Sequence, residues 1–138
     1  MKHETYIKEI LKLAKKAFEK EEVPVGALIV YNNKIIARGY NKTVSKKSVL
    51  EHAEIEVIKK AENKLGDWRL SECTLYVSLK PCHMCQEIIK QSRIKNVFYL
   101  CDNQKKINYK TNFERLENMF YLELEDLIKE FFKNKRKG

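Results

Sequence analysis

Along residues 5–101, segments whose apolar residues have helical spacing are interleaved with short strand-like apolar runs, and the order of these segments limits the possible folds. Residues 5–20 repeat apolar positions every three or four residues with lysines between them, which is typical of a helix that packs one face on a core. The expected elements are, in order, helix, strand, strand, helix, strand, helix and strand, over residues 5–20, 25–31, 34–40, 52–63, 73–79, 81–92 and 95–101. This order predicts an α/β fold in which strand–helix–strand units pair in parallel through right-handed crossovers.

The connections should be short, because the 138 residues include only 4 Gly and 2 Pro. Asn32-Asn33 separates two strand-like runs and predicts a hairpin. Residues 41–50 are polar and predict a loop, residues 102–112 are polar without a clear period, and residues 123–136 predict a final helix. The length is that of one ordinary domain, so we expect a single domain over residues 1–138 that needs no disulfide or structural metal for its core.

The formal net charge of +9 favours a polyanion as partner, although a lysine-rich, solvated surface would give the same number. The chain has no apolar stretch of membrane-spanning length, and residues 1–8 lack the apolar segment of a secretory signal. We therefore expect a cytoplasmic protein. Its 4 Cys should be reduced, and a close pair of them indicates a metal or redox site before a disulfide.

Two short segments, each expected to open a helix, carry the residues best suited to chemistry. They are His52-Ala53-Glu54 and Pro81-Cys82-His83-Met84-Cys85. Proline suits the first helical position, where no amide donor is needed, so Cys82 and Cys85 should lie in one helical turn and share a face. The positive end of the helix dipole there favours thiolates, which are the form that binds metals.

Two thiolates and one imidazole provide three zinc ligands from Cys82, Cys85 and His52. A catalytic zinc keeps its fourth position for water and lowers the pKa of that water to near 7. Glu54 lies two residues after His52 and is placed to carry protons rather than to bind the metal. These residues therefore predict zinc-assisted hydrolysis.

Two other uses of the same residues remain open. The Cys82-x-x-Cys85 pair could be redox-active, although this leaves no use for His52 and Glu54. A structural zinc site would need a fourth ligand, and the candidates are His83, Cys73 and Cys101. We expect His83 to point away from the metal face, Cys73 and Cys101 to be small core residues, and His3 to be a terminal surface residue.

The pairing of H-x-E with P-C-x-x-C resembles the signature of the zinc-dependent cytidine deaminase superfamily. Further stretches look most like those of bacterial tRNA-specific adenosine deaminases, over about residues 4–102 and 123–136. They are Glu22-Val23-Pro24-Val25-Gly26-Ala27, Gly39-Tyr40-Asn41, Arg69-Leu70, Thr74-Leu75-Tyr76-Val77, Ser92-Arg93-Ile94 and the terminal Phe131-Phe132 with its basic residues. Guanine and cytosine deaminases share some of these flanking stretches.

The resemblance implies a three-layer α/β/α fold with a central mixed sheet of about five strands. It also implies one Zn²⁺ per subunit on His52, Cys82 and Cys85, proton transfer by Glu54, and a homodimer with active sites near the interface. Asn41 would hydrogen-bond the target base, and Ala27 would line the pocket with its backbone N–H near that base. The chain departs from the family at Lys80, where glutamate is usual.

A second departure is the segment 102–113, which lacks the Lys-Thr-Gly-Ala type of stretch and leads over a shortened region to the last helix. The fifth strand is therefore expected to be short or to lie within residues 118–122.

The expected reaction is the hydrolytic deamination of adenosine to inosine at the wobble position (34) of a tRNA anticodon. The alternatives are the same zinc chemistry on a free base or nucleoside, such as guanine or cytosine, and a zinc-containing RNA-binding protein without catalysis. A basic C-terminal tail favours contact with RNA phosphates over a merely solvated end. It consists of Lys133, Lys135, Arg136 and Lys137.

Overall fold

Four strands form one mixed sheet in the order β2-β1-β3-β4. The computed structural model describes residues 2–103, 109–116 and 120–137, and the side chains of residues 2, 121 and 135–137 also lie outside the description. The strands are β1 (Gly26–Tyr31), β2 (Lys34–Tyr40), β3 (Thr74–Leu79) and β4 (Asn96–Cys101). Strand β1 pairs antiparallel with both β2 and β3, whereas β3 and β4 are parallel. The parallel pair joined by a helix confirms the expected crossover unit.

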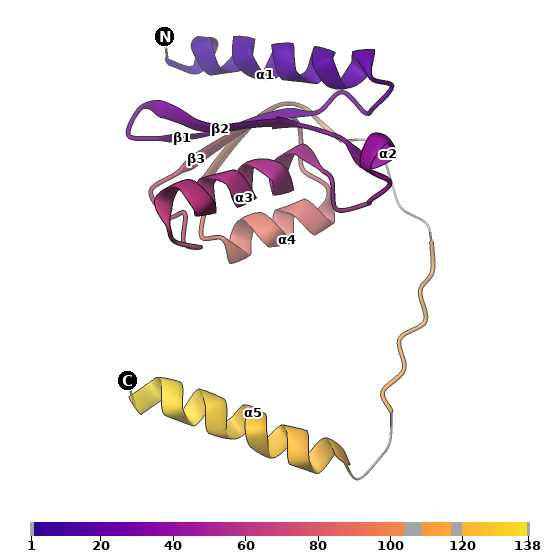
Figure 1. The fold of residues 1–138 in the computed structure, drawn as a ribbon, viewed down its shortest axis with the longest axis vertical. Coiled ribbons are helices and arrows are strands. Elements are labelled where there is room, and N and C mark those ends of the chain that lie inside the picture. Colours follow the sequence, from indigo (N-terminus) through magenta and orange to yellow (C-terminus); the bar gives the residue numbers. More distant parts are fainter. Residues whose placement is uncertain (1, 104–108, 117–119, 138) are drawn as a thin grey trace. The chain divides into compact units, whose positions relative to one another are not determined.

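Helices cover both faces of this sheet and give the expected three layers (Figure 1). The helices are α1 (Lys2–Glu19), α2 (Thr43–Lys46), α3 (Ala53–Leu65), α4 (His83–Gln91) and α5 (Phe120–Lys137). Helix α1 lies on one face, and α3 and α4 lie on the other. Alternate residues of β1 supply the two cores: Leu28 and Val30 face α1, whereas Ala27 and Ile29 face the core that α3 and α4 cover.

The close approach of α1 to β1 depends on a glycine. A Cβ atom added to Gly26 would lie 2.5 Å from the Ile10 carbonyl oxygen of α1. The adjoining hairpin turns at Asn32 and Asn33, whose φ angles of 50° and 63° are the left-handed values that a tight hairpin requires. This confirms the hairpin expected from the sequence.

The described residues form four strands, so the expectation of about five was wrong for this part of the chain. Residues 118 and 119, where part of a fifth strand was expected, lie outside the described residues, and from Phe120 onward the chain is helical. Apolar residues there recur every three or four positions, as at Leu124, Leu127, Ile128 and Phe131, which is a helical and not a strand period.

The short helix α2 lies inside the segment that we expected to be a polar loop. Its first amides are satisfied by a distant residue: the buried Glu22 carboxylate accepts hydrogen bonds from the backbone N–H groups of Val44 and Ser45, at 3.0 and 2.8 Å. These two hydrogen bonds lower the pKa of Glu22, against the opposing effect of burial. A carboxylate at this position also complements the positive end of the helix.

The chain divides into two compact units, residues 1–105 and 106–138. All predicted metal and catalytic residues lie in the first unit. The second contains α5, which carries exposed Phe131 and Phe132. The single domain expected over residues 1–138 stays a prediction. Within the described residues, no helix combines the length and the apolar character that crossing a membrane requires.

Candidate metal and catalytic centre

Three predicted metal-binding side chains meet where α3 and α4 begin. His52 is the N-cap residue of α3, Cys82 is the N-cap residue of α4, and Cys85 lies in the first turn of α4. The Nδ1 atom of His52 lies 3.4 Å from the Cys85 Sγ atom and 3.7 Å from the Cys82 Sγ atom. The possible ligand atoms of all three residues lie within 4.8 Å of one another. Segments 30 residues apart in the chain are thus brought to one point.

The start of α3 is capped from another segment, and this leaves the histidine turned toward the thiols. His52 makes no capping hydrogen bond with its own side chain. Instead the Asn41 Oδ1 atom accepts a hydrogen bond from the backbone N–H of Ala53 at 2.9 Å. Asparagine is a favoured capping residue because its side-chain oxygen satisfies an amide that the helix cannot.

The helix α4 begins two residues later than expected. Pro81 precedes the N-cap residue Cys82 and does not occupy the first helical position. The consequence for the site is small, because an N-cap residue and a residue three positions later still lie over the same turn. The expectation that Cys82 and Cys85 converge is confirmed, although the reason given from Pro81 was wrong.

The three donors fit a zinc ion. With Zn–N distances of about 2.0–2.1 Å and Zn–S distances of about 2.3 Å, a tetrahedral site places nitrogen and sulfur about 3.6 Å apart. The observed separations of 3.4 and 3.7 Å lie on both sides of this value. Burial raises the pKa of the Cys85 thiol above its usual range, and the nearby Glu54 and Cys82 charges raise it further. A bound cation reverses this effect because it stabilises the thiolate.

Glu54 lies in the first turn of α3 and is 3% exposed. Burial raises its pKa to about 7, against a smaller opposing effect of a backbone hydrogen bond. Its charge also raises the pKa of the Cys85 thiol, so the carboxylate acts on one of the three donors. A carboxyl group whose pKa lies near neutral pH can both accept and return a proton, which is the requirement for a proton carrier in hydrolysis.

Of the two residues expected to contact a base, Asn41 is hydrogen-bonded to the start of α3, and Ala27 belongs to the same core cluster as Ala53. Asn41 is buried, and its backbone N–H donates to the carbonyl oxygen of Val25, the residue just before β1. Ala27 is fully buried in the central strand β1, opposite Gly39 of β2 and Val77 of β3. Their contacts with a substrate stay predictions. The capping role of Asn41 was not anticipated, because it needs the spatial position of Ala53.

The residues of the competing interpretations lie apart from this group. Among the described residues, only His52, Cys82 and Cys85 form a group of three or more possible metal donors. His83 is exposed, and Cys73 is buried in the core, as expected. Cys101 is exposed, so its expected core position was wrong: it ends the edge strand β4.

Three further expectations concern residues outside the centre. His3 is exposed as expected, but its Nδ1 atom also lies 2.6 Å from the Tyr76 hydroxyl oxygen. The Lys80 side chain is exposed, with its Nζ atom 5.8 Å from the centroid of the Tyr99 ring. In the basic tail, Lys133 is exposed on α5, whereas the side chains of Lys135, Arg136 and Lys137 lie outside the described residues.

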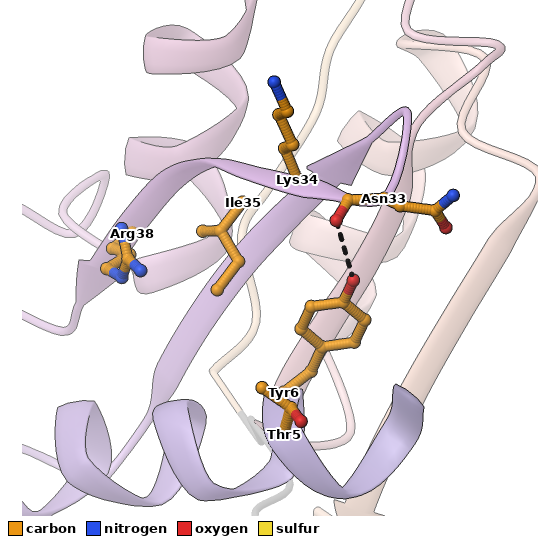
Figure 2. A pocket seen from close by; sticks show the side chains of 6 residues that line it. All are labelled: Thr5, Tyr6, Asn33, Lys34, Ile35 and Arg38. Atoms are coloured by element: carbon orange, nitrogen blue, oxygen red, sulfur yellow. Dashed lines mark hydrogen bonds between the residues drawn. The ribbon is translucent and has the colours of Figure 1, made fainter. Parts of the chain in front are cut away.

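A recess of about 420 Å³ lies elsewhere, between the start of α1 and the β1–β2 hairpin (Figure 2). The Tyr6 hydroxyl crosses it to donate to the Asn33 carbonyl oxygen at 3.3 Å, and Lys34, Ile35 and Arg38 line it. None of the three metal donors and neither Glu54 nor Asn41 borders it. We therefore place the candidate chemistry at the helix starts and not in this recess.

A model of MafB19-like deaminases matches residues 1–136. The chain belongs to the MafB19-like deaminase family. It is 48% identical to the tRNA-specific adenosine deaminase of Bacillus subtilis (strain 168) over 96 residues, which are 70% of this chain and 60% of that protein. It is 41% identical to the tRNA-specific adenosine deaminase of Rickettsia bellii (strain RML369-C) over 144 residues, covering 94% of this chain and 99% of that protein. The chain thus spans about 60% of the length of the Bacillus relative and nearly all of the Rickettsia relative.

Two solved structures of other deaminases share this family member's fold. One comes from a study of A-to-I editing by tRNA:A34 deaminases at the wobble position of transfer RNA, with a TM-score of 0.72 and 38% identity over 75% of this chain and 79% of that chain. The other is guanine deaminase from Bacillus subtilis, with a TM-score of 0.83 and 29% identity over 94% of this chain and 95% of that chain. The α/β/α architecture inferred from the sequence resemblance is thereby confirmed.

Proposed function

We propose that this protein is a zinc-dependent hydrolase that deaminates adenosine to inosine at the wobble position (34) of a tRNA anticodon. The observation that carries the chemistry is the convergence of His52, Cys82 and Cys85, together with the buried Glu54 carboxyl, which acts on Cys85. Three donors leave a fourth position for water, which separates a catalytic zinc site from a structural one.

When zinc is bound by these three residues, it supplies a water molecule whose pKa is lowered to near 7. Glu54 would accept one proton of the attacking water and give it to N1 of the purine while the water oxygen adds to C6. Glu54 would then pass the second proton of that water to the amino nitrogen; the C6–N bond breaks, and adenosine and water become inosine and ammonia. The near-neutral pKa of Glu54 suits a group that must accept and return protons in one cycle.

Asn41 and Ala27 are proposed to hold the base. The Asn41 Oδ1 atom is occupied by the Ala53 N–H, so the same carboxamide presents its Nδ2 amide as the donor for a ring nitrogen or ribose oxygen of the substrate. Ala27 pairs in the sheet with Gly39, two residues before Asn41. The helix cap would thus also fix the orientation of a substrate-binding group.

The substrate is proposed from three supports. The relatives at 48% and 41% identity are tRNA-specific adenosine deaminases, the net charge of +9 suits a polyanion, and a base in an anticodon loop is already splayed out of a duplex. Lys133, Lys135, Arg136 and Lys137 are proposed as phosphate contacts of the tail. We further propose a homodimer in the cytoplasm, with residues 1–138 working as one deaminase domain.

Deamination of a free base is the second candidate. The guanine deaminase structure of Bacillus subtilis covers more of the chain and has a higher TM-score than the tRNA:A34 deaminase structure. Its sequence identity to this chain is 29%, however, against 38% for the tRNA:A34 deaminase structure. A fold similarity of this kind does not fix the substrate, since the same architecture serves several substrates.

The deciding experiment measures inosine in an anticodon stem-loop with adenosine at the wobble position, using zinc-loaded protein. Free adenosine, guanine and cytosine are parallel substrates with ammonia release as the readout. We expect inosine in the stem-loop only. Glu54→Gln, which keeps the size of the side chain, should retain one zinc per chain and lose turnover by at least the 10²–10⁴-fold that general acid–base catalysis supplies. Turnover of guanine with an unreacted stem-loop would move the protein to the second candidate function.

A further inference from the structure

Two lysines contact the side chain of Tyr40 at the end of β2. The Lys20 Nζ atom donates to the Tyr40 hydroxyl oxygen at 2.9 Å, and the Lys42 Nζ atom lies 4.3 Å from the centroid of the Tyr40 ring. Lys20 follows the end of α1, and Lys42 precedes α2. We call Lys20, Tyr40 and Lys42 the Tyr40 cluster, which two separate chain segments build.

The cluster leaves positive charge available. Lys42 is held by an ion pair with Glu56, which also binds Lys60 at 3.2 Å. Lys20, in contrast, donates to a neutral phenol and has no carboxylate partner within the described part of the chain. The charged side chains that act on the Tyr40 hydroxyl are all lysines, with Lys16 as the third, and together with the Lys20 hydrogen bond they lower the pKa of Tyr40. The phenol oxygen therefore lies in a positive field.

The cluster adjoins the candidate catalytic centre along two chain segments. Asn41, which caps α3 at Ala53, directly follows Tyr40. Glu56, the partner of Lys42, donates its backbone N–H to the His52 carbonyl oxygen at 3.1 Å. An anion bound at Tyr40 would therefore lie one residue along the chain from Asn41, which is proposed to hold the base.

We propose that the Tyr40 cluster binds a phosphodiester group of the RNA strand next to the target adenosine. The Tyr40 hydroxyl and the Lys20 ammonium are the donors, and Lys42 adds positive charge from a fixed position. A phosphate oxygen accepts several donors at once, and such contacts set the position of a strand without reading its sequence. This inference rests on the proposed function for the identity of its ligand.

The test is the salt dependence of RNA binding. Zinc-loaded protein is titrated into a fluorescein-labelled anticodon stem-loop at several KCl concentrations, and the dissociation constant is read from fluorescence anisotropy. Lys20→Gln should reduce the slope of log K against log salt by about 0.7, the value for one lost contact with single-stranded nucleic acid. Lys20→Arg should keep the slope. Tyr40→Phe should weaken binding about tenfold, the size of one charge-assisted hydrogen bond.

Lys12→Gln is the matched control, because Lys12 is an exposed lysine of α1 that has no ion pair among the described residues. Melting temperature and zinc content verify that each variant is folded; if Lys20→Gln fails this check, Tyr40→Phe decides. Equal slopes for Lys20→Gln and Lys12→Gln overturn the proposal, as does a wild-type protein that does not bind the stem-loop.

Competition by adenosine 5′-monophosphate shows whether the ligand of the Tyr40 cluster is a mononucleotide or an RNA chain. If this nucleotide displaces the stem-loop from the wild type but not from Lys20→Gln, the cluster takes a terminal phosphate and the RNA assignment is wrong. Failure of the wild type to form inosine would refute the proposed function alone, because the binding comparison does not depend on turnover.

Discussion

Asn41 combines a helix cap with a proposed substrate contact, and two substitutions separate these roles. Asn41→Ala removes both the oxygen that caps α3 and the amide donor. Asn41→Asp keeps an oxygen that accepts from the Ala53 N–H, and its negative charge suits the positive start of a helix. It removes only the amide donor proposed for the base.

The size of the effect follows from the burial of the capped amide. Losing a capping residue costs about 1 kcal/mol of stability, and leaving a buried donor without a partner costs about 1–3 kcal/mol. Ala53 is 0% exposed, so water cannot replace Asn41 without rearrangement. We expect Asn41→Ala to lower the free energy of unfolding by about 2 kcal/mol, which is roughly 4–8 °C in Tm for a domain of this size. Asn41→Asp should stay within about 1 kcal/mol of wild type.

The assay is urea denaturation followed by circular dichroism, on zinc-loaded protein at pH 7, with inosine formation measured on the same samples. Both variants should lose RNA editing, but only Asn41→Ala should also lose stability. A stable Asn41→Ala variant would refute the capping argument. Equal destabilisation by both substitutions would show that the amide donor, and not the oxygen, holds the start of α3.

Three more predictions concern the metal site, the contact between α1 and β1, and the start of α2. Cys85→Ser should lower zinc affinity by more than the 10–100-fold typical of losing an outer-shell partner, as measured by competition with a zinc-binding dye. Gly26→Ala should cost about 1–3 kcal/mol in urea denaturation because the new Cβ meets the Ile10 carbonyl, whereas Gly66→Ala, with open space but a φ of 68°, should cost about 1 kcal/mol. Glu22→Gln should flatten the acid limb of a stability–pH curve. The folded pKa of Glu22 lies below 4.5, so its stabilisation is present above pH 4.5 and is lost as the pH falls through the folded pKa; an unchanged acid limb would contradict this.

The parts of the fold that the sequence predicts are those in which local pattern and tertiary environment agree. The strands β1 and β3 are continuous apolar runs because both faces are covered, and both site motifs lie at the starts of helices whose apolar periods the sequence shows. His52, Cys82 and Cys85 could therefore be grouped without coordinates, since two of them share a turn and the third opens the preceding helix.

The parts that could not be predicted depend on contacts between distant segments. Helix α2 forms in a polar stretch because Glu22, about 20 residues earlier, accepts from its first amides. Cys101 is exposed because β4 is an edge strand, and edge position depends on the strand order and not on local composition. The Tyr40 cluster was missed for the same reason, although Gly39-Tyr40-Asn41 was recognised as a motif.

The convergence of His52 and Cys85 also has a mechanical consequence. The two residues are separated by 33 positions, and the intervening chain contains all of α3 and β3. An ion held by both would act as a cross-link that closes this segment into a loop and restricts the unfolded chain. Loss of the ion should then release the α3–α4 layer first, while the α1 layer on the opposite face keeps its slow amide exchange. Metal supply would in this way set how rigid one side of the sheet is.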